Sequence, residues 1–180
     1  MRIKVLSSVA ACLGLALTAG AAQAADWKPS GVFISGGFAE HSAYSVNAGV
    51  VWPWDWRYET SSGVVTAQTE ASLGQWSGKS ATDRVSFTQV VLQPLFRYNF
   101  DKSATGLFVE GGIGLSYTDR IYITSTKTFS TRFNFADTIG TGYNFGKQEI
   151  GVRVTHYSNA SIKRPNPGEN FLQLRYAMKF

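Results

Sequence analysis

Residues 43–52 of the chain read Ala-Tyr-Ser-Val-Asn-Ala-Gly-Val-Val-Trp, and this stretch decides the fold. Large apolar side chains alternate along it with small or polar ones, with the period of two that is typical of a β-strand. One face carries Tyr44, Val46, Ala48, Val50 and Trp52, and the other carries Ala43, Ser45, Asn47 and Gly49. Such a strand suits a transmembrane β-barrel, in which lipid contacts the apolar face and the barrel interior takes the other.

Seven further segments alternate in the same way, and clusters of Gly, Ser, Asp, Asn and Pro separate them. The eight segments lie near residues 31–39, 42–52, 62–73, 84–100, 105–117, 131–145, 149–159 and 170–180. The pattern predicts an all-β fold, an eight-stranded antiparallel transmembrane β-barrel that occupies residues 25–180 as one domain. In the fourth segment the alternation changes phase between Phe87 and Val90, which predicts either a β-bulge or a hairpin that rises out of the membrane.

A soluble β-sandwich or lipocalin is the alternative, because it also contains short alternating strands, with the apolar face turned inward. Export, the aromatic last residue Phe180 and the aromatic clusters at segment ends favour the membrane. The clearest cluster consists of Trp52, Trp54, Trp56 and Tyr58. Such side chains gather where a barrel meets the lipid headgroups.

The first 24 residues have the anatomy of a cleaved signal peptide. Arg2 and Lys4 precede an apolar stretch, and small residues lead to a cleavage site after Ala24. The only cysteine, Cys12, falls inside this segment, so the mature chain has no disulfide, thiol nucleophile or thiolate metal site. Export together with a barrel pattern predicts the outer membrane of a Gram-negative bacterium as the location.

Composition narrows the possible partners. Beyond residue 24 no apolar run approaches the roughly 18 to 20 residues that a spanning helix needs, so membrane insertion requires a closed barrel. Two of the 17 basic residues lie in the signal peptide, against 12 acidic residues in the whole chain. The small, scattered positive charge that remains argues against nucleic acid and suits anionic lipid headgroups. Two separated histidines and no mature cysteine make no recognisable metal site.

One of the two histidines, His156, forms a candidate catalytic pair with Ser158. The two residues are two positions apart on one strand, so their side chains lie on the same face, within reach of the hydrogen bond that activates a serine nucleophile. Parity turns this face toward lipid, near the outer end of the strand. The plain alternative is a pair of polar residues that ends an apolar stripe at headgroup level.

Two carboxylates are candidates for orienting the imidazole. Glu169 is the only acidic residue after Ser158 and stands where the eighth strand begins. Asp137 lies on the apolar face of the sixth strand, and a tight turn at Lys147 and Gln148 would set it directly opposite Ser158. A register slip of one residue would turn Asp137 to the other face.

The string His156-Tyr157-Ser158-Asn159-Ala160, followed by Lys163, Pro165-Asn166 and Gly168-Glu169, resembles the lipid A 3-O-deacylase (PagL) family. Residues 108–114 and 134–142 also resemble family segments, so the similarity covers most of the mature chain. The resemblance implies an eight-stranded barrel whose Ser-His-Glu triad faces the membrane and removes the ester-linked acyl chain at position 3 of lipid A.

The resemblance makes Ser158 the nucleophile, His156 the general base and Glu169 its orienting acid, and it implies that Asn159 helps to form the oxyanion hole. The chain departs from the best-known member by a second proline in the loop after Ser158 and by a loop one residue shorter. This departure bears on the assignment of the acid more than on that of the nucleophile, so Asp137 stays as the second candidate for the acid.

The expected reaction is hydrolysis through an acyl-enzyme that releases a 3-hydroxy fatty acid and requires no cofactor. Its partners are lipid A within lipopolysaccharide, as the substrate, and the surrounding outer-membrane lipids. A non-catalytic barrel that serves as an anchor or adhesion protein is the alternative from another class, and acyl transfer instead of hydrolysis is a third. The oligomeric state, including a homodimer, is left open.

Overall fold

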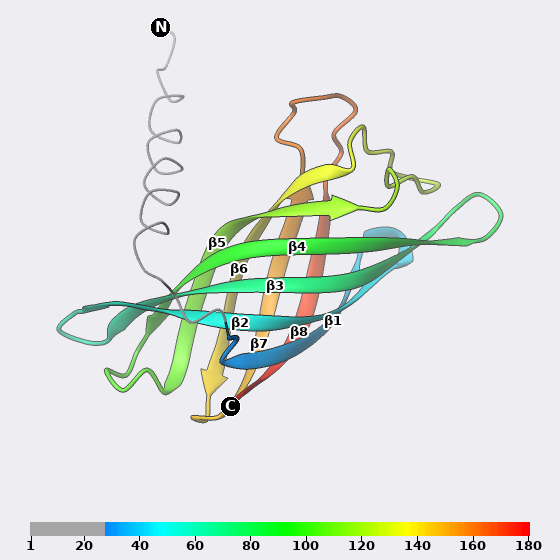
Figure 1. Cartoon of the computed structure of the whole chain (residues 1–180). Helices are drawn as coiled ribbons and strands as arrows, with labels where there is room; N and C mark the ends of the chain where they lie inside the picture. Colours follow the sequence, from blue (N-terminus) through cyan, green and yellow to red (C-terminus); the bar gives the residue numbers. More distant parts are fainter. Residues whose placement is uncertain (1–27) are drawn as a thin grey trace, which may run out of the picture.

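The structure, a computed structural model, describes residues 28–180 as eight antiparallel strands that close into a barrel (Figure 1). The strands are β1 (Gly31–Ala39), β2 (Ala43–Glu59), β3 (Val64–Lys79), β4 (Arg84–Asn99), β5 (Gly106–Thr118), β6 (Phe133–Asn144), β7 (Gln148–Ser158) and β8 (Glu169–Lys179), with a short 3₁₀ turn, η1 (Glu40–Ser42), between β1 and β2. Each strand pairs with the next, and β1 also pairs with β8, so the predicted fold class is confirmed. The predicted signal peptide, residues 1–24, lies outside the described residues.

None of the helices in residues 28–180 has the length and apolar character needed to cross a membrane.

Alternation along the strands separates an apolar outer surface from a polar interior. The faces predicted for the second, fifth and eighth segments are confirmed: Val46 and Leu174, for example, are exposed on the outside, whereas Ser45, Glu110 and Arg175 are buried inside. An outer wall made of Val, Leu, Ile and aromatic side chains is the surface that a lipid bilayer accommodates.

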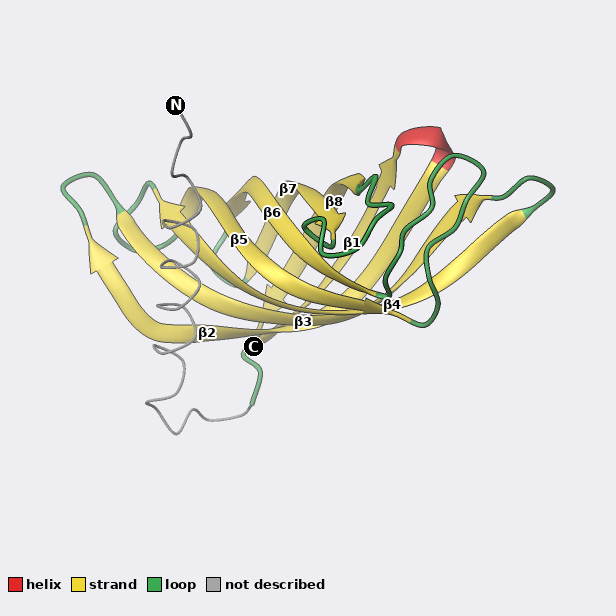
Figure 2. Cartoon of the chain, turned by 90° about the horizontal axis from the view of Figure 1, so that it is seen from above, coloured by secondary structure: helices red, strands yellow, loops and turns green. Residues whose placement is uncertain are grey.

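Two strands differ from the sequence prediction. β4 keeps one phase throughout and pairs continuously with β3, so the predicted β-bulge is wrong. Phe87 points into the interior, where aromatic side chains pack, and this made the alternation look interrupted. β2 ends at Glu59, seven residues later than predicted, because Pro53 and a break in the register obscure the alternation there. The β2–β3 and β3–β4 hairpins therefore extend past the rest of the barrel at opposite ends (Figures 1 and 2).

Because β2 continues, the aromatic residues expected at its end lie within the strand. The rings of Trp54 and Trp56 pack edge-on against Phe96 of β4 at centroid distances of 5.8 and 6.1 Å.

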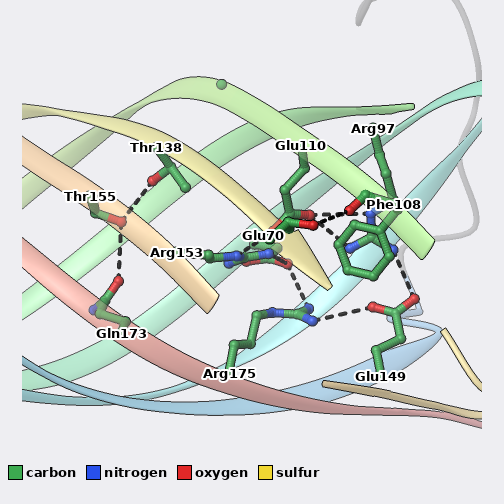
Figure 3. A network of polar contacts seen from close by, with 12 residues as sticks. Glu70, Arg97, Phe108, Glu110, Thr138, Glu149, Arg153, Thr155, Gln173 and Arg175 are labelled. Carbon is green, nitrogen blue, oxygen red and sulfur yellow. Dashed lines mark hydrogen bonds and ion pairs between the residues drawn. The ribbon is translucent and has the colours of Figure 1, made fainter. Parts of the chain in front are cut away.

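A balanced network of buried charges (Figure 3) lies in the half of the barrel where β1 begins and β8 ends. It consists of the carboxylates of Glu70, Glu110 and Glu149 and the guanidiniums of Arg97, Arg153 and Arg175. Each arginine contacts two of the carboxylates, and the Arg97 guanidinium also lies 3.8 Å from the ring centroid of Phe108. Buried ions are tolerated only when paired in this way, because taking a charge out of water costs several kcal/mol. The network forms a paired polar plug inside the barrel.

An aromatic cluster closes the interior toward the other end. Its members are Ala43, Trp76, Phe87, Tyr122, Phe129, Ala136, Tyr157 and Phe171, all at most 4% exposed. Tyr122 and Phe129 belong to the loop between β5 and β6, residues 119–132, which folds inward over the barrel mouth. The interior at this end is therefore packed with side chains, and a reactive group there has to lie on the outer wall or in the loops.

Candidate active site

His156 and Ser158 stand at the end of β7 where the aromatic cluster closes the barrel. On the outward face of β7 they follow Val152 and Val154, which are 45% and 41% exposed, while Thr155 and Tyr157 between them are buried inside. The loops that follow β5 and β7 lie together at this end, opposite the C-terminus (Figure 1). Strand parity thus places the histidine and the serine on the outer wall, as the sequence predicts.

The imidazole of His156 is held from β8. Its Nδ1 lies 2.7 Å from Oδ1 of Asn170, the residue directly opposite His156 in the β7–β8 ladder. The other side of the ring lies over Gly168, where an added Cβ would be 2.6 Å from Cε1 and 3.2 Å from Nε2. Sequence reasoning missed both residues, although the alternation that turns Leu172 and Leu174 outward also turns residue 170 outward.

Asp137 lies opposite His156 and not opposite Ser158. The β6–β7 ladder pairs Asp137 with His156 and Phe135 with Ser158. The expected pairing of Asp137 with Ser158 is wrong by two residues because the turn is centred on Gly146 and Lys147, and the N–H of Phe145 donates to the carbonyl of Gln148. A shift of two residues preserves the face of a strand, so Asp137 stays on the outer wall.

Glu169 points into the barrel, away from His156. It pairs with Tyr157 in the ladder and is 1% exposed. Its carboxylate accepts a hydrogen bond of 3.0 Å from the Tyr122 hydroxyl and lies 2.8 Å from Nζ of Lys127. The expectation that Glu169 contacts the imidazole is corrected by this placement, since the alternation of β8 directs residue 169 inward and residue 170 outward.

The contacts of Glu169 tie the inward-folded loop to β8. Burial, together with the neighbouring carboxylate of Glu169, raises the pKa of Tyr122 above its usual value. The phenol therefore stays protonated and can donate to Glu169. In the described chain this carboxylate acts as an anchor for residues 119–132.

Asn159 joins the two outer loops. Its side-chain amide donates to Ser130 Oγ, Thr131 Oγ1 and the carbonyl of Lys163, at 2.9 to 3.1 Å. Its backbone N–H donates to Oδ1 of Asn166 at 3.1 Å. The side chain expected in the oxyanion hole is thus committed to holding the loops together.

The turn after Ser158 directs a backbone donor at the serine. The N–H of Ala160 lies 3.4 Å from Ser158 Oγ, and Ala160 and Ser161 both have positive φ, 52° and 61°. Successive residues of this conformation curl the chain tightly, and the N–H of Ile162 donates to the carbonyl of Asn159 at 3.0 Å.

A polar cleft of about 560 Å³ lies between the two outer loops. It is lined by Thr126, Lys127, Thr128, Ser161, Arg164, Pro165, Asn166 and Pro167. Arg164 is exposed, whereas the Lys127 ammonium is paired with Glu169. Within residues 28–180, no group of three or more His, Cys, Asp or Glu side chains is placed to hold a metal ion.

Comparison with known proteins agrees with this geometry. The family model for lipid A 3-O-deacylase (PagL) matches residues 42–179. Lipid A deacylase PagL of Pseudomonas aeruginosa is 32% identical over 158 residues, 86% of each chain, and lipid A deacylase PagL of Bordetella bronchiseptica is 28% identical over 168 residues, 92% of each chain.

The crystal structure of the outer membrane enzyme PagL has the same fold, with a TM-score of 0.73 and 29% identity. The matched region covers 83% of this chain and 99% of the chain in that crystal structure. The sequence, the barrel and the wall-facing histidine and serine lead to one assignment: the chain belongs to the lipid A 3-O-deacylase (PagL) family of outer-membrane enzymes.

Proposed function

We propose that this chain hydrolyses the ester-linked acyl chain at position 3 of lipid A, with Ser158 as the nucleophile and His156 as the general base. The observation that carries the proposal is that both side chains share the outward face of β7 while the interior behind them is packed with aromatic rings. A lipid substrate reaches such a site by lateral diffusion along the wall and never enters the barrel.

The reaction follows the logic of serine hydrolases. His156 Nε2 takes the hydroxyl proton as Ser158 Oγ attacks the ester carbonyl carbon. The tetrahedral intermediate then breaks its bond to the sugar oxygen, which takes the proton from the imidazolium. Water, activated by the same imidazole, attacks the acyl-serine, releases a 3-hydroxy fatty acid and restores the serine hydroxyl. The backbone N–H of Ala160 would stabilise the oxyanion, and its distance of 3.4 Å from Ser158 Oγ supports this role.

The surroundings of the pair suit a substrate with a polar head and apolar chains. The exposed valine and leucine side chains below the site offer a surface for acyl chains. The polar cleft above it offers Arg164 to a phosphate or a sugar hydroxyl. The substrate would therefore span the boundary between the wall and the loops, where the serine stands. Cross-linking in native membranes would measure whether the chain forms homodimers.

Mass spectra of lipid A test the proposal directly. The wild-type chain, expressed in a host with intact lipid A, should remove one 3-hydroxyacyl chain, and Ser158→Ala should leave lipid A unchanged. Ser86→Ala, which alters an exposed serine on β4 far from the histidine in the strand order, is the matched control and should behave as the wild type. Identical lipid A spectra with wild-type and Ser158→Ala barrels, both folded, would defeat the proposal and favour a non-catalytic barrel.

A further inference from the structure

The residue that contacts Nδ1 of His156 is an amide and not a carboxylate. Nδ1 and Asn170 Oδ1 are 2.7 Å apart, and the two residues are direct partners in the β7–β8 ladder. In a serine hydrolase this nitrogen usually faces the acid of the triad. The chain therefore has an unusual group in the third position, and the structure shows where its carboxylates are instead.

Two carboxylates are near enough to consider, and their placements differ. Glu169 lies on the inner face, where Tyr122 and Lys127 take both of its oxygens. Asp137 lies on the outer face of β6, directly opposite His156 on the side away from β8. Across an antiparallel pair, the Cβ atoms of opposite residues are about 4.5 to 5.5 Å apart. The imidazole thus stands between an amide on β8 and a carboxylate on β6.

We propose that Asn170 is the positioning residue of the catalytic histidine in this chain, and that Asp137 supplies the negative charge from the opposite strand. The inference rests on the proposed function, because it assigns partners to the same histidine. The two tasks that one carboxylate performs in a Ser-His-acid triad, orientation and charge, are then divided between two strands.

The chemistry of an amide oxygen explains the first task. This oxygen can only accept a hydrogen bond, so Nδ1 must carry the proton and Nε2 must carry the lone pair. That tautomer is the one that can remove the proton of Ser158, and an asparagine fixes it in the same way in Cys-His-Asn proteases. An amide carries no charge, however, so it does little for the imidazolium that forms during the reaction. Asp137, on the other side of the ring, carries the negative charge that stabilises the imidazolium.

Variants of Asn170 and Asp137 separate these roles in the refolded full chain, with kcat and KM measured from the release of 3-hydroxy fatty acid from lipid A. Asn170→Leu removes the acceptor at nearly constant size and should lower kcat by about 10- to 100-fold, with KM within about twofold of wild type. Asn170→Asp restores an acceptor oxygen at the same place and should recover most of kcat. Leu73→Ala, an outward leucine on β3 that is far from the histidine in the strand order, is the matched control and should leave kcat unchanged.

The role of the negative charge of Asp137 is tested by moving the carboxylate from residue 137 to residue 170. Asp137→Asn should lower kcat by about tenfold or more. The double variant Asp137→Asn/Asn170→Asp should regain activity, because a carboxylate again stands beside the imidazole. A residue with a merely structural role would give no such rescue. Reaction of Ser158 with a fluorophosphonate gives a second readout of the activated serine that does not depend on lipid A binding.

The outcomes distinguish this inference from the function on which it rests. If Asn170→Leu keeps wild-type kcat, or if Asp137→Asn is not rescued by Asn170→Asp, the inference is overturned even though Ser158→Ala is inactive. If Ser158→Ala is as active as the wild type, the proposed function fails first. Heat-modifiable migration on gels verifies folding of each barrel, and Asn170→Ala replaces the leucine variant if that variant does not fold.

Discussion

Glu70→Gln should destabilise the barrel far more than the loss of a charge at its surface. Glu70 Oε2 lies 2.7 Å from Nη1 of Arg153, and Oε1 lies 2.7 Å from Nη2 of Arg175. All three side chains are at most 6% exposed. Glutamine has nearly the same size and shape, so the substitution leaves packing intact, removes the charge and replaces one accepting oxygen with an NH2 group that faces an arginine N–H. Each arginine then keeps one carboxylate, Glu110 or Glu149, in place of two.

The magnitude follows from this partial loss. Removing one partner of a buried ion pair costs ~3–5 kcal/mol. Because each guanidinium keeps a second carboxylate, we expect the lower end, about 3 kcal/mol, which is about a hundredfold change in the folding equilibrium. Glu59→Gln is the matched control. It breaks the exposed pair of Arg57 and Glu59, whose side chains are 51% and 60% exposed, and should cost at most about 1 kcal/mol.

Urea unfolding of the barrel in lipid vesicles, followed by tryptophan fluorescence, measures both variants. Trp76 lies in the interior aromatic cluster, so its emission reports the loss of the packed barrel. The reasoning is refuted if Glu70→Gln lowers the free energy of unfolding no more than Glu59→Gln does. Water inside the barrel would then be solvating the released guanidiniums, and the network would not be the dry ion cluster that its burial indicates.

Three further substitutions test the outer end of the barrel. Gly168→Ala should lower kcat by about tenfold or more in a folded barrel. Residue 168 has a φ of +69°, and an added Cβ would displace the His156 ring. Unchanged turnover would contradict this placement of the imidazole. Asn159→Ala should free the two outer loops from each other and speed their cleavage by protease, while unchanged cleavage would show that its three hydrogen bonds do not hold the loops. Tyr122→Phe removes one hydrogen bond from Glu169 and should lower the free energy of unfolding by about 0.5–1.5 kcal/mol. Ser158 of this variant should still react with a fluorophosphonate. Loss of that reaction would indicate that Glu169 is part of the catalytic site.

Local periodicity predicted the features that depend on one strand alone. The face of each residue repeats every two positions, so the outward placement of His156, Ser158 and Asp137 could be read from β6 and β7 separately. The same argument, applied strictly to β8, places Glu169 inside and Asn170 outside. The similarity to a Ser-His-Glu family favoured the glutamate over what the alternation indicates.

Features that depend on two strands or on a loop could not be predicted in the same way. The partner of Asp137 is set by where the β6–β7 turn is centred, and the signal for that centre is Gly146, whose positive φ of 96° suits the first central position of a two-residue turn, and not the alternation of the strands. The inward fold of residues 119–132 has no periodic signal, because Tyr122 and Phe129 are buried by contacts with distant strands and not by the pattern of their own segment. Asn159 was assigned to the oxyanion hole through the family resemblance, and nothing local indicated its role between the loops because its partners, Ser130 and Thr131, are remote in sequence.

The register that aligns the site is held from inside the barrel. Asp137 and His156 face outward as a pair, and the adjacent pair in the same ladder, Thr138 and Thr155, faces inward. The two threonine hydroxyls are 2.8 Å apart, and Thr155 donates onward to Gln173 of β8 (Figure 3). A slip of one residue would break this buried chain and also turn the histidine into the interior. The polar contacts that stabilise β6, β7 and β8 against one another therefore also fix the alignment of Asp137, His156 and Asn170 on the outer wall. A substrate that stays in the membrane reaches these side chains already aligned.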